Sequence, residues 1–448
     1  MSREDTGRPS RIPDEGRRPR RTEFLNVNHP ERVLSESTSR SRLHRNEPFE
    51  ADPNIPGSFL LQHIASPNNL MAAWKYLAAN GGQAAGPDEI SFDISISMAW
   101  RIVRDLSADI LAGTYRPGPT REVRIPRPGR SDRIIEIPNV RDRMIGRAIA
   151  CALRPLFVTV LTRFYGVGRE HIFARLKVEA ETSNRFFILQ DDIQNCFPTA
   201  NRGLASSIVR QNSEGWCRTG MPAEEFGIVE LIIRIIYGFQ GENQSTGFTQ
   251  GSTLSPLIME LLLHVTVDAA FQPASSTNTT LHRYVDDICV QAQSPSDASE
   301  AMDAIRNTVN RNGQSLKGQS TDPMDLRTNQ SEDTVLGLMP VWENGQLTFS
   351  LTDRARLHLR EQLEECPLLA VPHRTVKQTV IGWINSIAAC IRTSDQDAIR
   401  TQIIRTMIDS GVEPLKDQDI RESIREASTR WHQLIRTTQT PNSQSESQ

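Results

Sequence analysis

Two apolar runs meet at adjacent carboxylates in residues 281–290, and this segment constrains the chain more than any other part of it. Its sequence, LHRYVDDICV, predicts a strand, a tight turn and a second strand, with Asp286 and Asp287 at the tip. Like charges this close repel each other, and a bound divalent metal ion is the usual remedy. Because Asp is also common in turns, a polar hairpin tip without a ligand is the alternative.

A second apolar run, within residues 186–198 (FFILQDDIQNCFP), also ends in carboxylates, Asp191 and Asp192. Two strands that each deliver an acid to one edge of a sheet can hold a pair of metal ions. Such a pair suits in-line attack at phosphorus, because one ion activates the nucleophile and the other stabilises the leaving oxygens. Mg²⁺ fits this site because it prefers oxygen ligands and keeps several waters for substrate phosphates.

A third segment, residues 249–264 (TQGSTLSPLIMELLLH), lies between the two acidic ones. We expect Ser255 to be the N-cap of a mostly apolar helix and Pro256 to be its first helical residue. Gly251 allows the backbone to come close to a ligand, as a strand-to-helix turn beneath a nucleotide requires. A glycine-containing turn of this kind is weak support when taken alone.

The order of these three segments resembles the palm of reverse transcriptases. Residues 80–88, 111–117 and 123–143 are similar to the N-terminal extension and fingers of group II intron-type bacterial enzymes. The resemblance implies an α+β fold in the right-hand polymerase arrangement, with fingers, a palm built on an antiparallel sheet, and a helical thumb. It predicts five parts: a disordered basic tail 1–48, a helical N-terminal extension 49–118, fingers and palm 119–352, a helical thumb 353–436, and a disordered tail 437–448.

The resemblance also implies which residues bind the metal ions. Asp192 and Asp286 would bind both Mg²⁺ ions, for which Mn²⁺ is a possible substitute. The carbonyl of Ile193 would be an added ligand and Asp287 a weaker or indirect partner. Asp191 competes with Asp192 for the first role. We prefer Asp192 because it places the aromatic residue five positions later where this family carries a bulky gate residue.

Nucleotide-binding roles follow from the same resemblance. The ring of Phe197 would collide with a ribose 2′-OH and so favour dNTPs; an ordinary core aromatic is the alternative. Arg127 and Arg133 would hold the incoming triphosphate, since guanidinium meets phosphate oxygens bidentately; a solvated basic hairpin is the alternative. Gln250 and Gly251 would shape the floor under the templating base pair.

Two places depart from the family pattern. A strand carrying a lysine is expected just before the Leu-Gly hairpin, but here Lys317 is followed by a polar stretch, residues 319–333. Lys317 is therefore either a general acid for pyrophosphate release or a surface lysine. No Cys-x-x-Cys and His pairing follows the polymerase region, so we expect no zinc-dependent DNA-cutting module.

Helices and a second hairpin are predicted after the acidic turn. Residues 296–310 have the spacing of an amphipathic helix. Asn344-Gly345 marks a two-residue hairpin turn, which by resemblance would grip the primer end. From Asp353 onward the pattern is helical, which fits a thumb or, alternatively, a dimerisation module. One apolar stripe at helical spacing comprises Val376, Val380, Trp383 or Ile384, Ile387 and Ile391.

Composition agrees with a large enzyme in the cytoplasm. No apolar run is long enough to span a bilayer, and the start of the chain lacks a signal peptide's apolar segment, so we expect no membrane partner. The six cysteines are scattered, which is typical of reduced thiols: Cys151, Cys196, Cys217, Cys289, Cys366 and Cys390.

The net charge of −3 does not exclude binding of a polyanion, because a channel can be basic while the exterior is acidic. Basic residues gather in the predicted fingers: Arg116, Arg121, Arg124, Arg127, Arg130 and Arg133. They gather again in the N-terminal tail, which is either an RNA-binding segment or a solvated one: Arg17, Arg18, Arg20, Arg21, Arg40, Arg42 and Arg45.

The function predicted is RNA-directed DNA polymerisation, in which dNTPs are added to the 3′-OH of a DNA or RNA primer on an RNA template. Three rivals remain: an RNA-dependent RNA polymerase, a template-independent or protein-primed DNA polymerase, and a maturase-like RNA-binding scaffold. Size and missing modules favour a stand-alone prokaryotic enzyme of antiphage defence, with a dedicated non-coding RNA and oligomerisation as further possibilities.

Overall fold

The computed structural model describes residues 60–80, 84–125, 133–160, 168–216, 223–274, 278–318, 322–328, 334–365 and 372–439. The predicted basic tail 1–48 lies outside these residues, as does Arg127, and the side chain of Arg133 is not described. Within the described part of the chain, no helix combines the length and the apolar character that crossing a bilayer requires.

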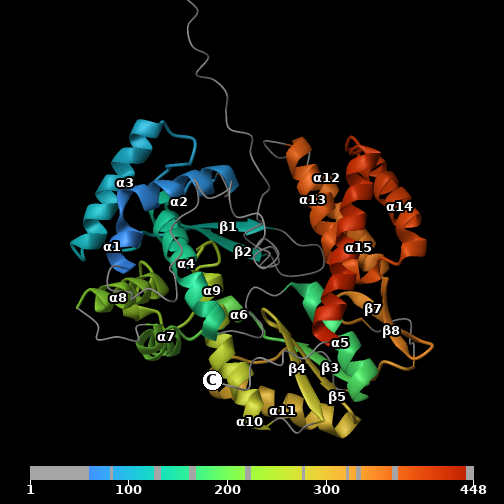
Figure 1. Ribbon diagram of the computed structural model, residues 1–448. Helices are drawn as coiled ribbons and strands as arrows, with labels where there is room; N and C mark the ends of the chain where they lie inside the picture. Colours follow the sequence, from blue (N-terminus) through green and yellow to red (C-terminus); the bar gives the residue numbers. More distant parts are fainter. Residues whose placement is uncertain are drawn as a thin grey trace, which may run out of the picture.

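A four-stranded antiparallel sheet lies at the base of the molecule (Figure 1). Its strand order is β4-β5-β3-β6. The strands are β3 (Phe187–Asp192), β4 (Thr279–Tyr284), β5 (Asp287–Ala292) and β6 (Met324–Asp325). The β4–β5 pair is the hairpin predicted for residues 281–290, and β3 is the strand predicted to end at the second pair of acids.

Side chains alternate between two cores across this sheet, as the period of a strand requires. On one face Leu189, Ile288 and Val290 join a core with helices α9 (Ser255–Leu263) and α11 (Pro295–Arg311). On the other face Ile188 and Cys289 join a second core with α5 (Arg169–Ser183). The amphipathic helix predicted for 296–310 is confirmed as α11, whose buried stripe includes Met302, Ile305 and Val309.

The N-terminal helices and a small hairpin form one side of the molecule (Figure 1). Residues 84–95, which we expected to continue the helical region, contain no helix. The elements are α1 (Leu60–Ala65), α2 (Pro67–Asn80), α3 (Ile96–Leu111), β1 (Arg121–Ile125), β2 (Arg133–Ile137), α4 (Val140–Val160), α6 (Cys196–Thr199), α7 (Arg202–Trp216), α8 (Ala223–Tyr237) and the 3₁₀ turn η3 (Gly241–Asn243).

Helix α9 begins one residue away from the predicted cap. Leu254 is the N-cap, and Ser255 and Pro256 are the first two helical residues, so the prediction of Ser255 as N-cap is wrong. The side chain of Ser252 accepts a hydrogen bond from the N–H of Leu254 just before the helix. The helix continues through a π-helical turn, η4 (His264–Asp268), into α10 (Ala269–Ala274).

The C-terminal helices form the opposite side of the molecule (Figure 1). A hairpin of β7 (Leu338–Glu343) and β8 (Gln346–Leu351) precedes them, and Asn344 and Gly345 both have positive φ, which confirms the predicted turn. The stripe predicted from Val376 to Ile391 is buried. The remaining elements are α12 (Asp353–Glu365), α13 (Pro372–Ser386), η6 (Ala388–Cys390), η7 (Thr393–Asp395), α14 (Gln396–Asp409) and α15 (Asp417–Gln439).

The predicted α+β class is thus confirmed. Helices flank an antiparallel sheet on two sides (Figure 1). Four of the six cysteines lie in the described residues, and all four are buried free thiols: Cys151, Cys196, Cys289 and Cys390.

Candidate active site

Asp192 at the end of β3, Asp287 at the start of β5 and Asp286 in the turn before β5 lie together at one end of the four-stranded sheet. In the register of β3 and β5, Asp192 lies directly opposite Asp287. The N–H of Ile193 donates to the carbonyl of Asp286 (3.1 Å), which holds the acidic turn against the end of β3. The residues predicted to bind metal, Asp192, Ile193, Asp286 and Asp287, are therefore neighbours in space.

Asp191 and Asp192 point to opposite faces of the sheet, which separates their roles. Asp191 pairs with Ile288 in the register, and its buried carboxylate accepts both the N–H of Gly318 (3.1 Å to each oxygen) and the N–H of Asp192 (2.9 Å). Arg306 of α11 lies 4.0 Å from it. The carboxylate of Asp191 thus binds backbone N–H groups, whereas the side chain of Asp192 lies on the same face of the sheet as that of Asp287.

Lys317 is an exposed residue whose side chain contacts the acid cluster. Its Nζ is 2.5 Å from Oδ2 of Asp192, and its backbone N–H donates to the carbonyl of the same residue (2.9 Å). The hydrogen bond from the N–H of Gly318 to Asp191 fixes the peptide that follows Lys317. The lysine is therefore held near the acids. The predicted strand carrying this lysine is reduced to a single bridge between Leu316 and Ile193.

The electrostatics of the site favour a bound cation. The pKa of Asp287 is raised to about 6, first by burial and then by the nearby charges of Asp286 and Asp192, although the charges of Arg169 and Lys317 lower it. Oδ1 of Asp192 is buried and has no hydrogen-bond partner. An unsatisfied carboxylate oxygen among like charges fits a hard cation such as Mg²⁺.

The carboxylate oxygens of these acids therefore fit the predicted Mg²⁺, although the side chains do not form a complete coordination site. Among the residues that the structure describes, no group of three or more His, Cys, Asp or Glu side chains already surrounds one point. In the absence of a metal ion, the ammonium group of Lys317 neutralises part of the negative charge on Asp192. Two or three carboxylates that leave positions for substrate oxygens suit Mg²⁺, which is seldom held by protein ligands alone.

The raised pKa of Asp287 predicts a pH dependence of stability in the metal-free protein. An acid whose folded-state pKa exceeds its ordinary 3.8 binds its proton more tightly when folded. Folding stability should therefore fall as pH rises from about 4 to about 6, by up to about 3 kcal/mol. Asp287→Asn removes this loss of stability. The free energy of unfolding of the variant should therefore exceed that of the wild type, by a difference that grows as the pH rises from about 4 to about 6. Parallel pH curves in urea denaturation would contradict the assignment, and Mg²⁺ at pH 7.5 should reduce the difference.

Phe197 lies shortly after Asp192 in the chain and is linked to the segment that precedes α9. Phe197 lies in α6, partly buried against the core, and its carbonyl accepts the N–H of Phe248 (2.9 Å). That bond ties α6 to the segment carrying Gln250 and Gly251. A Cβ on Gly251 would overlap the carbonyl oxygen of Glu136 at the end of β2, so this turn packs directly on the β1–β2 hairpin.

Sequence reasoning missed three charged residues beneath the acidic turn: Arg283 and Asp268 are buried, and Glu260 is partly buried. Arg283 of β4 forms ion pairs with Glu260 of α9 and Asp268 of the π-helical turn. Two sequence features could have revealed them. One is an arginine near the end of a predicted strand, and the other is a pair of acids in a mostly apolar helix. Buried charges are paired, so each of these residues required a partner elsewhere in the chain.

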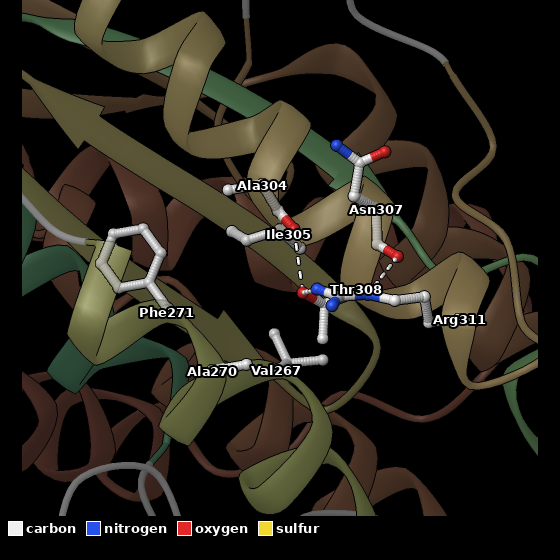
Figure 2. Close-up of a pocket in the computed structure, with 8 residues that line it drawn as sticks. All are labelled: Val267, Ala270, Phe271, Ala304, Ile305, Asn307, Thr308 and Arg311. Atoms are coloured by element: carbon white, nitrogen blue, oxygen red, sulfur yellow. Dashed lines mark hydrogen bonds between the residues drawn. The ribbon is translucent and has the colours of Figure 1, made fainter.

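A hollow of about 200 Å³ lies apart from the predicted residues, between α10 and α11 (Figure 2). Val267, Phe271 and Ile305 contribute apolar walls, and Arg311 at one end donates to Oγ1 of Thr308 (3.0 Å). None of the predicted site residues lines it, so it belongs to the packing of these helices and not to the acid cluster.

Part of the chain is similar to known proteins. Residues 125–322 match the family described as “Reverse transcriptase (RNA-dependent DNA polymerase)”. Protein YkfC of Escherichia coli (strain K12) is 26% identical over 228 residues, which are 48% of this chain and 57% of YkfC. The chain therefore aligns with little more than half the length of this relative.

Two solved polymerase structures show a remote likeness. One is a Sicinivirus 3Dpol RNA-dependent RNA polymerase, with a TM-score of 0.46 and 11% identity over 79% of this chain and 74% of that one. The other is telomerase from Candida albicans in complex with a fragment of telomeric RNA, with a TM-score of 0.40 and 11% identity over 73% of this chain and 65% of that one.

Proposed function

We propose that the protein is an RNA-directed DNA polymerase that adds dNTPs to the 3′-OH of a primer by phosphoryl transfer. One observation carries this proposal: Asp192 lies opposite Asp287 beside the Asp286 turn, inside the region that matches the reverse transcriptase family. Adjacent carboxylates at the edge of a sheet provide the oxygen ligands that phosphoryl transfer by Mg²⁺ requires.

Each residue of the site has a role in this reaction. Asp192 and Asp286 would hold two Mg²⁺ ions, with Asp287 and the Ile193 carbonyl assisting. When bound, the ions would activate the 3′-OH and neutralise charge on the phosphates. Lys317 is released from Asp192 in this arrangement and can donate a proton to the departing pyrophosphate.

Substrate selection rests on residues around the acids. Arg133, at the start of β2, and Arg127 would bind the triphosphate, and Gln250 and Gly251 would support the templating base pair. Phe197 would exclude the 2′-OH of ribonucleotides. The protein would be of the group II intron-like bacterial type, acting in the cytoplasm without a membrane partner.

The test of the proposed function is primer extension on a defined RNA template with dNTPs or rNTPs. We expect the wild type to prefer dNTPs, and Phe197→Val to raise rNTP incorporation about 100-fold, because an added hydroxyl is rejected mainly by steric exclusion in an apolar pocket. Phe186→Val is the matched control, because Phe186 packs against Trp342 away from the acids and should leave the ratio unchanged. An rNTP preference in the wild type would instead indicate an RNA-dependent RNA polymerase.

Two further outcomes separate the other candidate functions. Equal DNA synthesis with and without template RNA would indicate a template-independent or protein-primed polymerase. RNA that copurifies with the protein, together with no extension of any primer, would indicate a maturase-like scaffold. A role in antiphage defence, with a dedicated non-coding RNA, is tested by sequencing that RNA and by comparing phage infection with and without the Asp286 variant.

A further inference from the structure

The turn that carries the acids has an unfavourable backbone conformation. Val285, the first of the two residues connecting β4 and β5, has a φ of +56°. A β-branched side chain is strongly disfavoured in this left-handed region, which glycine adopts without penalty. Because the direction of the Asp286 carboxylate depends on the preceding peptide, the conformation of Val285 determines where that carboxylate points.

A buried arginine contacts the strained residue. Nη1 of Arg283 donates to the carbonyl of Val285 (2.9 Å), two residues ahead in the chain. The guanidinium lies beneath the turn with its side chain 1% exposed. A charged donor in such a site makes a strong hydrogen bond, because little water competes for the carbonyl.

Two acids hold that guanidinium in place. Nε and Nη2 of Arg283 each lie 2.8 Å from one oxygen of Asp268, and Nη1 lies 3.0 Å from Oε2 of Glu260. Although burial lowers the pKa of Arg283, the charges of Glu260 and Asp268 raise it above its ordinary value, so the residue stays charged. The bidentate contact fixes the plane of the guanidinium as well as its position.

The π-helical turn brings the two acids to the same side of their helix. In a regular α-helix, residues eight positions apart differ by about 80° around the axis. A π-turn contains more residues per turn and so reduces that difference. The segment His264–Asp268 has this geometry, and both Glu260 and Asp268 reach Arg283. π-Turns occur frequently at functional sites.

We propose that Arg283 is the positioning residue of the acidic turn: held by Asp268 and Glu260, it keeps Val285 in its left-handed conformation and thereby directs the carboxylate of Asp286 toward Asp192. This inference rests on the proposed function, since it assigns a cause to the geometry of the polymerase site. Arg283 touches no substrate in this role and acts through the Val285 carbonyl.

The test combines Arg283→Lys with Val285→Gly. Lysine keeps the charge but lacks the planar fork that contacts Asp268 and the Val285 carbonyl together. We expect Arg283→Lys to lower kcat about 30-fold, because the Asp286 carboxylate would be misplaced. The KM for dNTP should change less than about threefold. Glycine adopts positive φ without support, so Val285→Gly should restore kcat at least about fivefold when it is added to Arg283→Lys.

A second measurement does not depend on catalysis. Mn²⁺ binding to the nucleotide-free protein, followed by electron paramagnetic resonance, should weaken about tenfold in Arg283→Lys and recover in the double variant. Arg185→Lys is the matched control, because Arg185 also forms a largely buried ion pair, with Glu179, but lies outside the site. Its kcat and Mn²⁺ affinity should equal those of the wild type.

Each outcome decides between this role and a merely structural one. A folded Arg283→Lys variant with wild-type kcat and Mn²⁺ affinity would overturn the proposal, and so would a loss that Val285→Gly does not restore. If Arg283→Lys fails to fold, Asp268→Asn replaces it, with the same expected loss and rescue and the same overturning results. Absence of extension by the wild type would instead contradict the proposed function, while the Mn²⁺ measurement would still test Arg283.

Discussion

Replacing Asp286 with Asn is expected to lower single-nucleotide incorporation by about 10³-fold or more, because metal-assisted charge stabilisation contributes several kcal/mol to the transition state. Asp192→Asn should have a similar effect, since Asp192 ends β3 next to the turn that carries Asp286. Both variants should fold. In the absence of metal, Asp286→Asn should be more stable than the wild type, because it removes a charge that raises the pKa of Asp287.

The measurement is single-turnover incorporation at saturating dNTP and Mg²⁺, accompanied by thermal unfolding with and without Mg²⁺. Asp303→Asn is the matched control: its exposed carboxylate on α11 pairs with Arg306, and its replacement should leave incorporation unchanged. Activity of Asp286→Asn within about tenfold of the wild type would remove the acid cluster from the mechanism, because a lost metal ligand has a larger effect.

The hairpin that carries these acids could be predicted from the sequence because its determinants are local. Alternating and apolar residues on either side of two acids predict two strands and a tip, and Asn344-Gly345 predicts the second hairpin in the same way. The choice between Asp191 and Asp192 is different, since it depends on which face of the sheet each residue occupies. Adjacent residues alternate faces, so the pairing of β3 with β5 decides it, and strands a hundred residues apart have no local signal for their register.

Contacts between distant charged groups were likewise beyond sequence reasoning. Lys317 reaches Asp192 across 125 positions of sequence, and its environment decides whether it is a surface lysine or part of the site. Glu260 and Asp268 interrupt an apolar helix, which indicates a buried partner without identifying Arg283 as that partner. The wrong prediction of Ser255 as the N-cap has a local cause. The side chain of Ser252 accepts the N–H of Leu254, and helix α9 begins without a side-chain cap.

Gly251→Ala is expected to cost about 3 kcal/mol or more of unfolding free energy, at the upper end for overpacking of a rigid interior. A Cβ at this position would overlap the carbonyl oxygen of Glu136 and lie 2.9 Å from its carbonyl carbon and 3.1 Å from Cδ of Pro138. The first two neighbours are backbone atoms of a paired strand, which cannot rotate away as a side chain can. The turn before α9 must therefore separate from the β1–β2 hairpin.

This separation should affect nucleotide binding more than the chemical step, because Gly251 connects the proposed template floor to the hairpin whose second strand begins at Arg133, whereas the acids lie at the four-stranded sheet. We expect the KM for dNTP to rise more than kcat falls, measured by steady-state extension below the unfolding temperature. Gly382→Ala is the matched control: it lies inside α13 with no atom near its Cβ position, so the same substitution should be neutral or stabilise by up to about 1 kcal/mol. Equal melting temperatures for the two variants would show that the turn and the hairpin are not in rigid contact.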